Sequence, residues 1–156
     1  MEKEIESKQN YVICDVAETN WGKSETLAEA VSLIKKIPGM KIIEDKPINK
    51  GKDRWFVGEL NGKTIVVSTL GDPTDRFTSL LDKAFDKNPC IFVTACRPCD
   101  ITQTELCHKA KGNGYDIIWF KNFHIDDKKL ATASIMAEAR RANAEAISKL
   151  VEMSVI

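Results

Sequence analysis

Hydrophobic residues occur in two patterns along the chain, short continuous apolar runs and longer stretches with helical spacing. The first continuous run covers residues 11–16, and residues 23–37 follow it after a polar stretch. In the second segment the apolar residues recur every three or four positions, as Leu27, Ala30, Val31, Ile34 and Ile37. The first pattern predicts a buried strand and the second an amphipathic helix. Pro38-Gly39 is a typical helix stop.

A hairpin is predicted in the middle of the chain. Residues 40–44 are expected to form a second strand, followed by a polar, Lys-rich loop that contains Pro47. Two further apolar segments, 54–60 and 64–69, flank Asn61-Gly62. A type I′ turn needs positive φ at both central residues, which Asn-Gly accepts readily. These two strands should therefore be antiparallel neighbours.

Helices and apolar strands alternate through the second half. A helix is expected to begin at Thr74 or Asp75, followed by a strand at 90–94, a helix at 101–111, a strand at 116–120 and a helix at about 126–153. This alternation predicts a mostly parallel sheet with helices on both faces. The predicted fold class is a three-layer α/β domain with one antiparallel hairpin strand. Residues 1–10 are interpreted as a charged leader and 11–156 as a single domain.

Composition restricts the possible partners and the compartment. The 156 residues include 23 Lys+Arg and 23 Asp+Glu, so the charge balance does not indicate a nucleic-acid or membrane partner. No apolar run approaches the roughly 20 residues that span a bilayer. The charged N-terminus also lacks the apolar core of a secretory signal. Five cysteines without an export signal favour reduced thiols and a cytoplasmic protein.

The polar stretch between the first strand and the first helix contains the main candidate site. Its residues are Ala17, Glu18, Thr19, Asn20, Trp21, Gly22, Lys23 and Ser24, followed by Glu25. They fit the pattern G-x-x-x-x-G-K-[ST], with alanine at the first position. In a strand–loop–helix setting, backbone N–H groups and the positive end of the helix dipole surround a phosphate. Gly22 permits close approach, Lys23 suits the β- and γ-phosphates, and the Ser24 hydroxyl suits Mg²⁺.

On these residues the chain resembles the P-loop NTPase superfamily. The resemblance implies that residues 17–25 bind a nucleoside triphosphate with Mg²⁺, and that the γ-phosphate is hydrolysed or transferred with Lys23 stabilising its charge. The guanine-reading N/T-K-x-D element is not evident after the strand at 90–94, where the sequence is Ala-Cys-Arg-Pro-Cys-Asp. Its absence there disfavours a GTPase without establishing ATP. The expected ligand is ATP or GTP, with ATP preferred.

P-loop enzymes usually place a carboxylate at the end of a neighbouring strand. After the strand at 64–69 the first carboxylate is Asp72, later than in the family pattern, and it is the candidate ligand of Mg²⁺ or water. The hydroxyls of Ser68 and Thr69 are further candidates for the metal shell. The alternative for Asp72 is a turn and helix cap. Asp15 is a rival that could instead bond the loop amides.

Arg97 is a third candidate catalytic residue, since it follows an apolar strand toward the edge where such sheets bind ligands. It could neutralise phosphate charge during transfer, and the alternative is an ordinary surface arginine.

The cysteines support a different hypothesis. Cys96 and Cys99 look somewhat like the Cys-x-x-Cys site of thioredoxins, in a setting that lowers thiol pKa. No proline follows Pro98, although thioredoxins need one on a later strand. The spacing is irregular for a zinc set assembled from Cys90, Cys96, Cys99, Cys107 and His108. Three functions remain open: a P-loop hydrolase or small kinase, a catalytically weak nucleotide-binding switch or partner subunit, and a thiol redox protein using Cys96 and Cys99.

Overall fold

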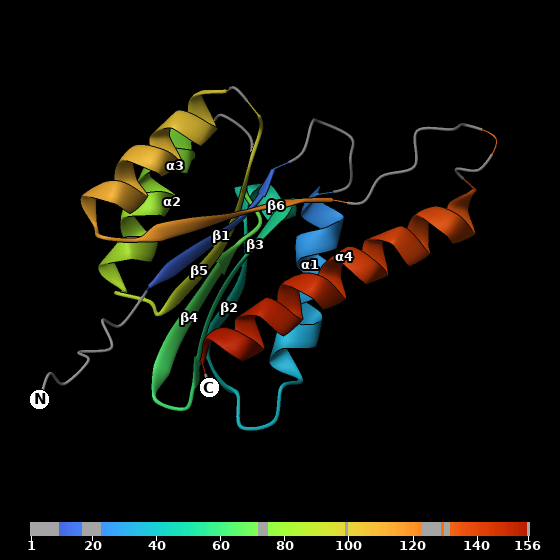
Figure 1. Ribbon diagram of the computed structural model, residues 1–156, viewed down its shortest axis with the longest axis horizontal. Helices are drawn as coiled ribbons and strands as arrows, with labels where there is room; N and C mark the ends of the chain where they lie inside the picture. The colour runs from blue at the N-terminus through green and yellow to red at the C-terminus, as the bar shows by residue number, and fades with distance from the viewer. Residues whose placement is uncertain are drawn as a thin grey trace, which may run out of the picture.

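The computed structural model in Figure 1 is an α/β fold with a six-stranded mixed sheet and four helices. It describes residues 10–16, 23–71, 75–98, 100–122, 129 and 132–155; within these, the side chains of residues 23, 24 and 75 are not described. The described elements are, in chain order, β1 (Tyr11–Val16), α1 (Lys23–Lys35), β2 (Lys41–Ile48), the short turn η1 (Asn49–Gly51), β3 (Asp53–Leu60), β4 (Lys63–Ser68), α2 (Asp75–Asp86), β5 (Ile91–Cys96), α3 (Ile101–Gly112), β6 (Asp116–Lys121) and α4 (Ala133–Ser154).

The strands lie in the order β2-β3-β4-β5-β1-β6. β4, β5, β1 and β6 pair in parallel, whereas β3 is antiparallel to both β2 and β4. Among the described strands, β3 alone is therefore antiparallel to the others. This agrees with the single antiparallel strand that the Asn61-Gly62 hairpin predicted. The four parallel strands end at one edge of the sheet, here called the carboxyl edge. Their last residues are Val16, Ser68, Cys96 and Lys121.

Helices cover both faces of the sheet, which confirms the three-layer arrangement (Figure 1). On one face α1 and α4 bury Leu27, Ile34 and Ile147 in a core with the strands. On the other face α2 and α3 bury Leu81 and Leu106 in a second core. All six residues of β5 are buried, which explains why this central strand has a continuous apolar sequence rather than an alternating one.

The hairpin between β3 and β4 has the turn that its sequence predicts. Asn61 and Gly62 have φ values of 53° and 74°, so both occupy the left-handed region. The flanking strands pair from Leu60 opposite Lys63 to Trp55 opposite Ser68. The right-handed twist of two antiparallel strands matches a turn with positive φ at its central residues.

Two predicted boundaries were wrong. The segment predicted as a polar loop after residue 44 continues as β2 to Ile48, and Pro47 lies within this strand. Because β2 is at the sheet edge, a residue without an N–H is tolerated there. The last helix begins at Ala133 rather than near residue 126, since the Thr132 hydroxyl caps it by accepting from the Ile135 N–H at 3.3 Å.

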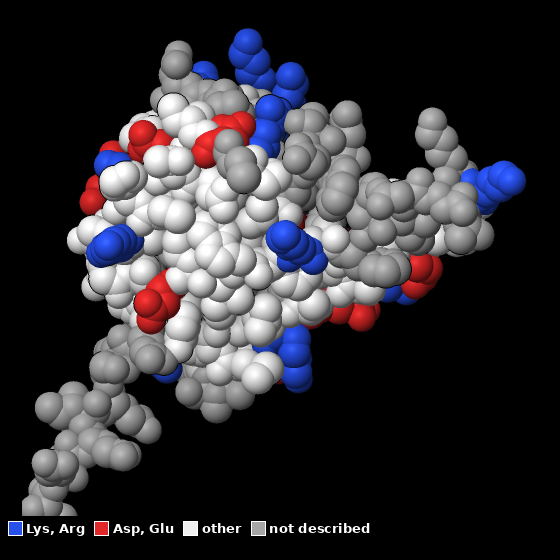
Figure 2. Space-filling model, turned by 45° about the horizontal axis from the view of Figure 1, so that its top comes forward, with Lys and Arg blue, Asp and Glu red and all other residues white. Residues whose placement is uncertain are grey.

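Charged side chains of both signs are scattered over the face shown in Figure 2, as the equal numbers of cationic and anionic residues suggest. Within the part of the chain that the structure describes, no helix combines the length and apolar character needed to cross a membrane.

Candidate functional site

The predicted phosphate loop connects β1 to α1 at the carboxyl edge. The strand before it and the helix after it are both present, because β1 ends at Val16 and α1 begins at Lys23. Glu25 is exposed in the first turn of α1. Residues 17–22 and the side chains of Lys23 and Ser24 lie outside the described part of the structure, so their contacts with phosphate and Mg²⁺ stay predictions.

β1 and β5 form a topological switch point. The two strands are adjacent and parallel, with Val16 opposite Cys96 at the carboxyl edge. The helix that follows β1 packs on one face of the sheet, whereas the helix that follows β5 packs on the opposite face. Chain segments that diverge in this way leave a crevice outside the strand ends, where open α/β sheets generally bind their ligands. The predicted loop begins at this point.

Arg97 lies beside the start of the loop, because it follows Cys96 and Cys96 is the register partner of Val16. Its backbone N–H donates to Thr102 Oγ1 at 3.1 Å. Asp100 caps α3 by accepting from the Thr102 N–H, also at 3.1 Å. These bonds fix the backbone of Arg97 directly after the end of β5, the strand next to β1.

The exit of β4 is fixed as well, although Asp72 itself lies outside the described residues. Thr69 Oγ1 donates to Asp53 Oδ1 at 2.7 Å and accepts from the Arg54 N–H at 3.0 Å. The Thr69 N–H donates in turn to the Arg54 carbonyl at 3.1 Å. The Thr69 hydroxyl, a candidate for the metal shell, therefore has a structural role. Ser68 Oγ is buried and has no hydrogen-bond partner within the described part of the chain.

Asp15 occupies a buried polar position at the end of β1. Its carboxylate can only accept hydrogen bonds, which orients the Asn122 amide nitrogen toward it at 2.9 and 2.8 Å from the two oxygens. The Asn122 oxygen then accepts from Thr26 Oγ1 at 3.3 Å. All three side chains are buried. Through Asn122, which follows β6, Asp15 of β1 is thus connected to Thr26 in the first turn of α1. These bonds join the element before the predicted loop to the element after it.

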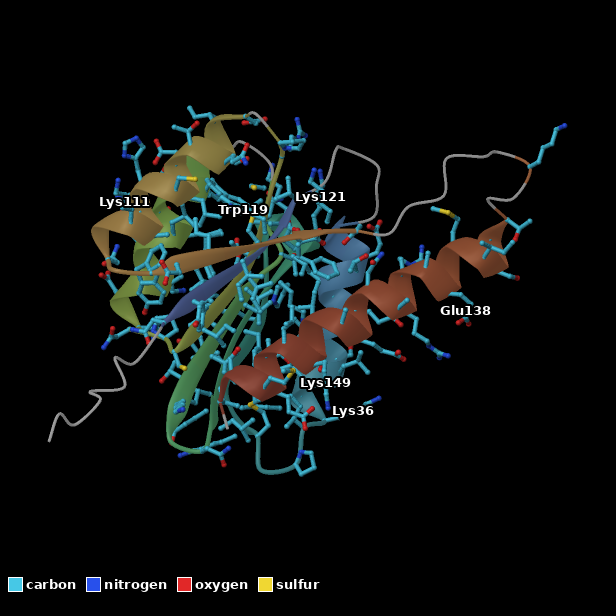
Figure 3. All side chains as sticks on the ribbon, viewed as in Figure 1. Lys36, Lys111, Trp119, Lys121, Glu138 and Lys149 are labelled. Carbon is cyan, nitrogen blue, oxygen red and sulfur yellow. The ribbon has the colours of Figure 1, made fainter. Side chains whose placement is uncertain are left out.

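Sequence reasoning did not identify Asn122 and Thr26. The available signal was the position of Asn122 two residues after the strand predicted at 116–120, because polar residues that follow parallel strands gather at one edge. Figure 3 shows Lys121, the residue before Asn122, at the end of β6 on this edge.

Of the two cysteines in the Cys-x-x-Cys sequence, the structure describes Cys96, which is the last residue of β5. Cys14 Sγ and Cys96 Sγ are 3.0 Å apart, and both side chains are fully buried between the sheet and the α2/α3 layer. Burial, followed by the neighbouring Cys96 thiol, raises the pKa of Cys14 well above its usual range. Cys99 lies outside the described residues, and Cys107 is exposed on α3.

This burial disfavours thiol exchange, because a disulfide substrate has no access to a fully buried sulfur. Within the described ranges, no three His, Cys, Asp or Glu residues form a group that could hold a metal ion.

No family model, curated protein or solved structure matches the chain. The interpretation of the site therefore depends on its own residues and geometry.

Proposed function

We propose that the chain binds a nucleoside triphosphate, with ATP preferred and Mg²⁺ as the counterion, through residues 17–25, and hydrolyses or transfers its γ-phosphate. The observation that carries this proposal is the position of the predicted loop. It follows a buried parallel strand, precedes a helix of 13 residues, and begins at the switch point between β1 and β5. Phosphate groups bind well in such a place, because unpaired N–H groups and the positive end of the helix dipole are directed toward it.

The proposed chemistry assigns a role to each candidate residue. Lys23 stabilises the charge on the β- and γ-phosphates, and Ser24 holds Mg²⁺. Asp72 supplies the second metal ligand or positions the attacking group. Arg97 compensates the charge that develops during transfer, since its backbone is held beside the loop by the Thr102 hydroxyl. The Asp15–Asn122–Thr26 connection keeps the two ends of the loop at a fixed separation.

Thermal unfolding with and without ATP and Mg²⁺ tests the binding proposal. A ligand at 100 times its Kd stabilises the folded state by about 2.7 kcal/mol, which raises Tm by roughly 5–10 °C for a domain of this size. The Lys23→Ala variant should lose this shift. Lys36→Ala is the matched control, because Lys36 lies at the opposite end of α1, near Lys149 of α4 (Figure 3). If neither ATP nor GTP shifts Tm, the nucleotide proposal is wrong.

Phosphate release under the same conditions separates catalysis from binding alone. An enzyme should release inorganic phosphate from ATP, or transfer it to an added acceptor, at a rate that Lys23→Ala and Asp72→Ala both reduce. Binding without turnover would instead support the nucleotide-binding switch, which the late position of Asp72 favours. GTP in place of ATP determines the base preference in either case.

A further inference from the structure

A cavity of about 470 Å³ opens at the carboxyl edge on the α2/α3 face of the sheet. One wall is formed by the end of β2 and the turn η1, from Lys46 to Gly51, and the opposite wall by the first turns of α2. Leu70, two residues beyond the end of β4, lies between them. We call this cavity the β2–α2 pocket. Its volume is within the range of small-molecule sites, about 300–1,000 Å³.

The lining of the β2–α2 pocket has two chemical sides. Lys46, Lys50 and Arg76 supply positive charge from β2, η1 and α2, and no carboxylate lines the cavity among the described residues. The apolar side consists of core residues, since Leu70 belongs to the α2/α3 core and Ile48 and Leu80 pack against it. A few convergent charges over an apolar floor are typical of sites for small organic ligands.

The positive charge extends past the rim of the pocket. Lys83 lies over the Trp55 ring at 4.6 Å from its centroid. Burial and then the neighbouring Lys46 lower the pKa of Lys83. Two ammonium groups that disfavour each other's charge are both stabilised when an anion lies close to them. Glu44 is a carboxylate near both ammonium groups, and its charge opposes this lowering of the Lys83 pKa.

The turn η1 presents its part of the pocket in a strained backbone conformation. Asn49, Lys50 and Gly51 have φ values of 51°, 56° and 83°, so three successive residues are left-handed. For a residue with a side chain this conformation costs about 1–2 kcal/mol. Asn49 Nδ2 donates to Asp53 Oδ2 at 2.8 Å, and the Lys52 N–H donates to the Asn49 carbonyl at 3.1 Å. Strain that the surroundings maintain is a recurrent feature of binding sites.

We propose that the β2–α2 pocket binds a small organic anion at a site separate from the proposed triphosphate loop. The phosphate or carboxylate group of this ligand contacts Lys46, Lys50 and Arg76, and its ring or aliphatic body packs on Ile48, Leu70 and Leu80. The turn fixes the backbone of Lys50 at the edge of the pocket, while its exposed side chain orders only when the ligand binds. Binding of the anion in this pocket does not depend on nucleotide hydrolysis at residues 17–25.

Calorimetric titration with three probes tests the pocket: AMP as a phosphomonoester, citrate as a carboxylate and adenosine as the neutral counterpart of AMP. At least one of the two anions, AMP or citrate, should bind. If AMP binds more tightly than citrate, the Kd of adenosine should be at least tenfold higher than that of AMP. The combined Lys46→Gln and Lys50→Gln variant should weaken anion binding at least tenfold. Lys52→Gln is the matched control, because Lys52 is exposed beside η1 but does not line the pocket, and it should change Kd less than twofold.

Two additional variants distinguish anion binding in the pocket from binding at the nucleotide loop. Lys50→Gly removes the charge while accepting the left-handed conformation, so it should weaken anion binding without loss of stability. Lys23→Ala should abolish the Tm shift with ATP and Mg²⁺ yet leave anion binding within twofold. If the anion instead depends on Lys23 and not on Lys46 and Lys50, it occupies the nucleotide loop and the pocket proposal is wrong. If no ATP binds but anion binding still depends on Lys46 and Lys50, the nucleotide proposal fails and the pocket remains.

Discussion

Thr69 donates its hydroxyl hydrogen to Asp53 at 2.7 Å, and through this bond the exit of β4 is joined to the start of β3. The other carboxylate oxygen of Asp53 accepts from the Asn49 amide. A single side chain therefore connects the strained turn η1 with the segment that leads to Asp72. The Asp53 carboxylate therefore fixes the turn η1, which lines the β2–α2 pocket, relative to the end of β4.

The Thr69→Val variant removes the hydroxyl while nearly conserving the shape of the side chain. It leaves Asp53 Oδ1 and the Arg54 N–H without this partner, which should lower the free energy of unfolding by about 1–3 kcal/mol. Urea unfolding measures the change. Thr64→Val on the same strand is the matched control, because Thr64 is half-buried at the other end of β4, and this variant should have a smaller effect. Equal losses for the two variants would show that the Thr69 hydroxyl contributes no more to stability than the half-buried hydroxyl of Thr64.

Asn122→Ala tests the buried connection to Asp15. The variant leaves a fully buried carboxylate without the amide that donates to both of its oxygens, so we expect a loss of about 2–4 kcal/mol in the free energy of unfolding. Asn113→Ala provides the comparison, since the Asn113 side chain donates to the Lys109 carbonyl at an exposed helix end and its removal should cost much less. A small effect of Asn122→Ala would mean that other groups satisfy Asp15.

These residues also show how far the sequence predicts the structure. Period and turn chemistry were sufficient for the Asn61-Gly62 hairpin and for the strand and helix around the loop, because both signals are local. The partners of Asp15 and Asp53 could not be found in this way. Asp15 contacts Asn122 only because β6 lies beside β1, and Asp53 contacts Thr69 only because β3 lies beside β4. Strand order depends on the packing of the whole chain, which periodicity does not specify.

The same limit applies to Pro47. Proline disfavours an interior strand, so its presence predicted a loop, whereas the edge position of β2 removes the penalty. Only the complete sheet shows which strand is at its edge.

Acid should remove the stabilisation that Asp45 contributes. Arg54 Nε donates to Asp45 Oδ1 at 2.8 Å and Lys35 pairs with the other oxygen; the hydrogen bond from Arg54 is the main cause that lowers the pKa of Asp45. Because the folded-state pKa lies below the unfolded value of about 3.9, the stabilisation is complete above that pH and is lost as the pH falls through the folded-state pKa. Asp45→Asn should therefore cost about 1–2 kcal/mol at pH 7 and progressively less below pH 4.

The pH dependence of the free energy of unfolding for wild type and Asp45→Asn measures this difference. Asp82→Asn is the control, because Asp82 is about half exposed and has one lysine partner, Lys109, so its loss at pH 7 should be smaller. A difference between wild type and Asp45→Asn that stays constant down to pH 2.5 would contradict the assignment of the effect to the carboxylate charge.

Gly58 and Gly112 differ in the space that is available for a side chain. A Cβ at Gly58 would lie 2.8 Å from Met40 Sδ and 2.8 Å from the buried ring of Phe56, which covers this position on β3. The ring cannot move without disturbing the α1/α4 core, so Gly58→Ala should cost about 1–3 kcal/mol of unfolding free energy. Gly112, the last residue of α3, has open space around its Cβ position. Gly112→Ala should instead stabilise the protein by about 0.4–1 kcal/mol, because alanine restricts the unfolded chain. Thermal unfolding of both variants measures the contrast, and a neutral Gly58→Ala would mean that the Met40 side chain and the Phe56 ring move aside at little cost.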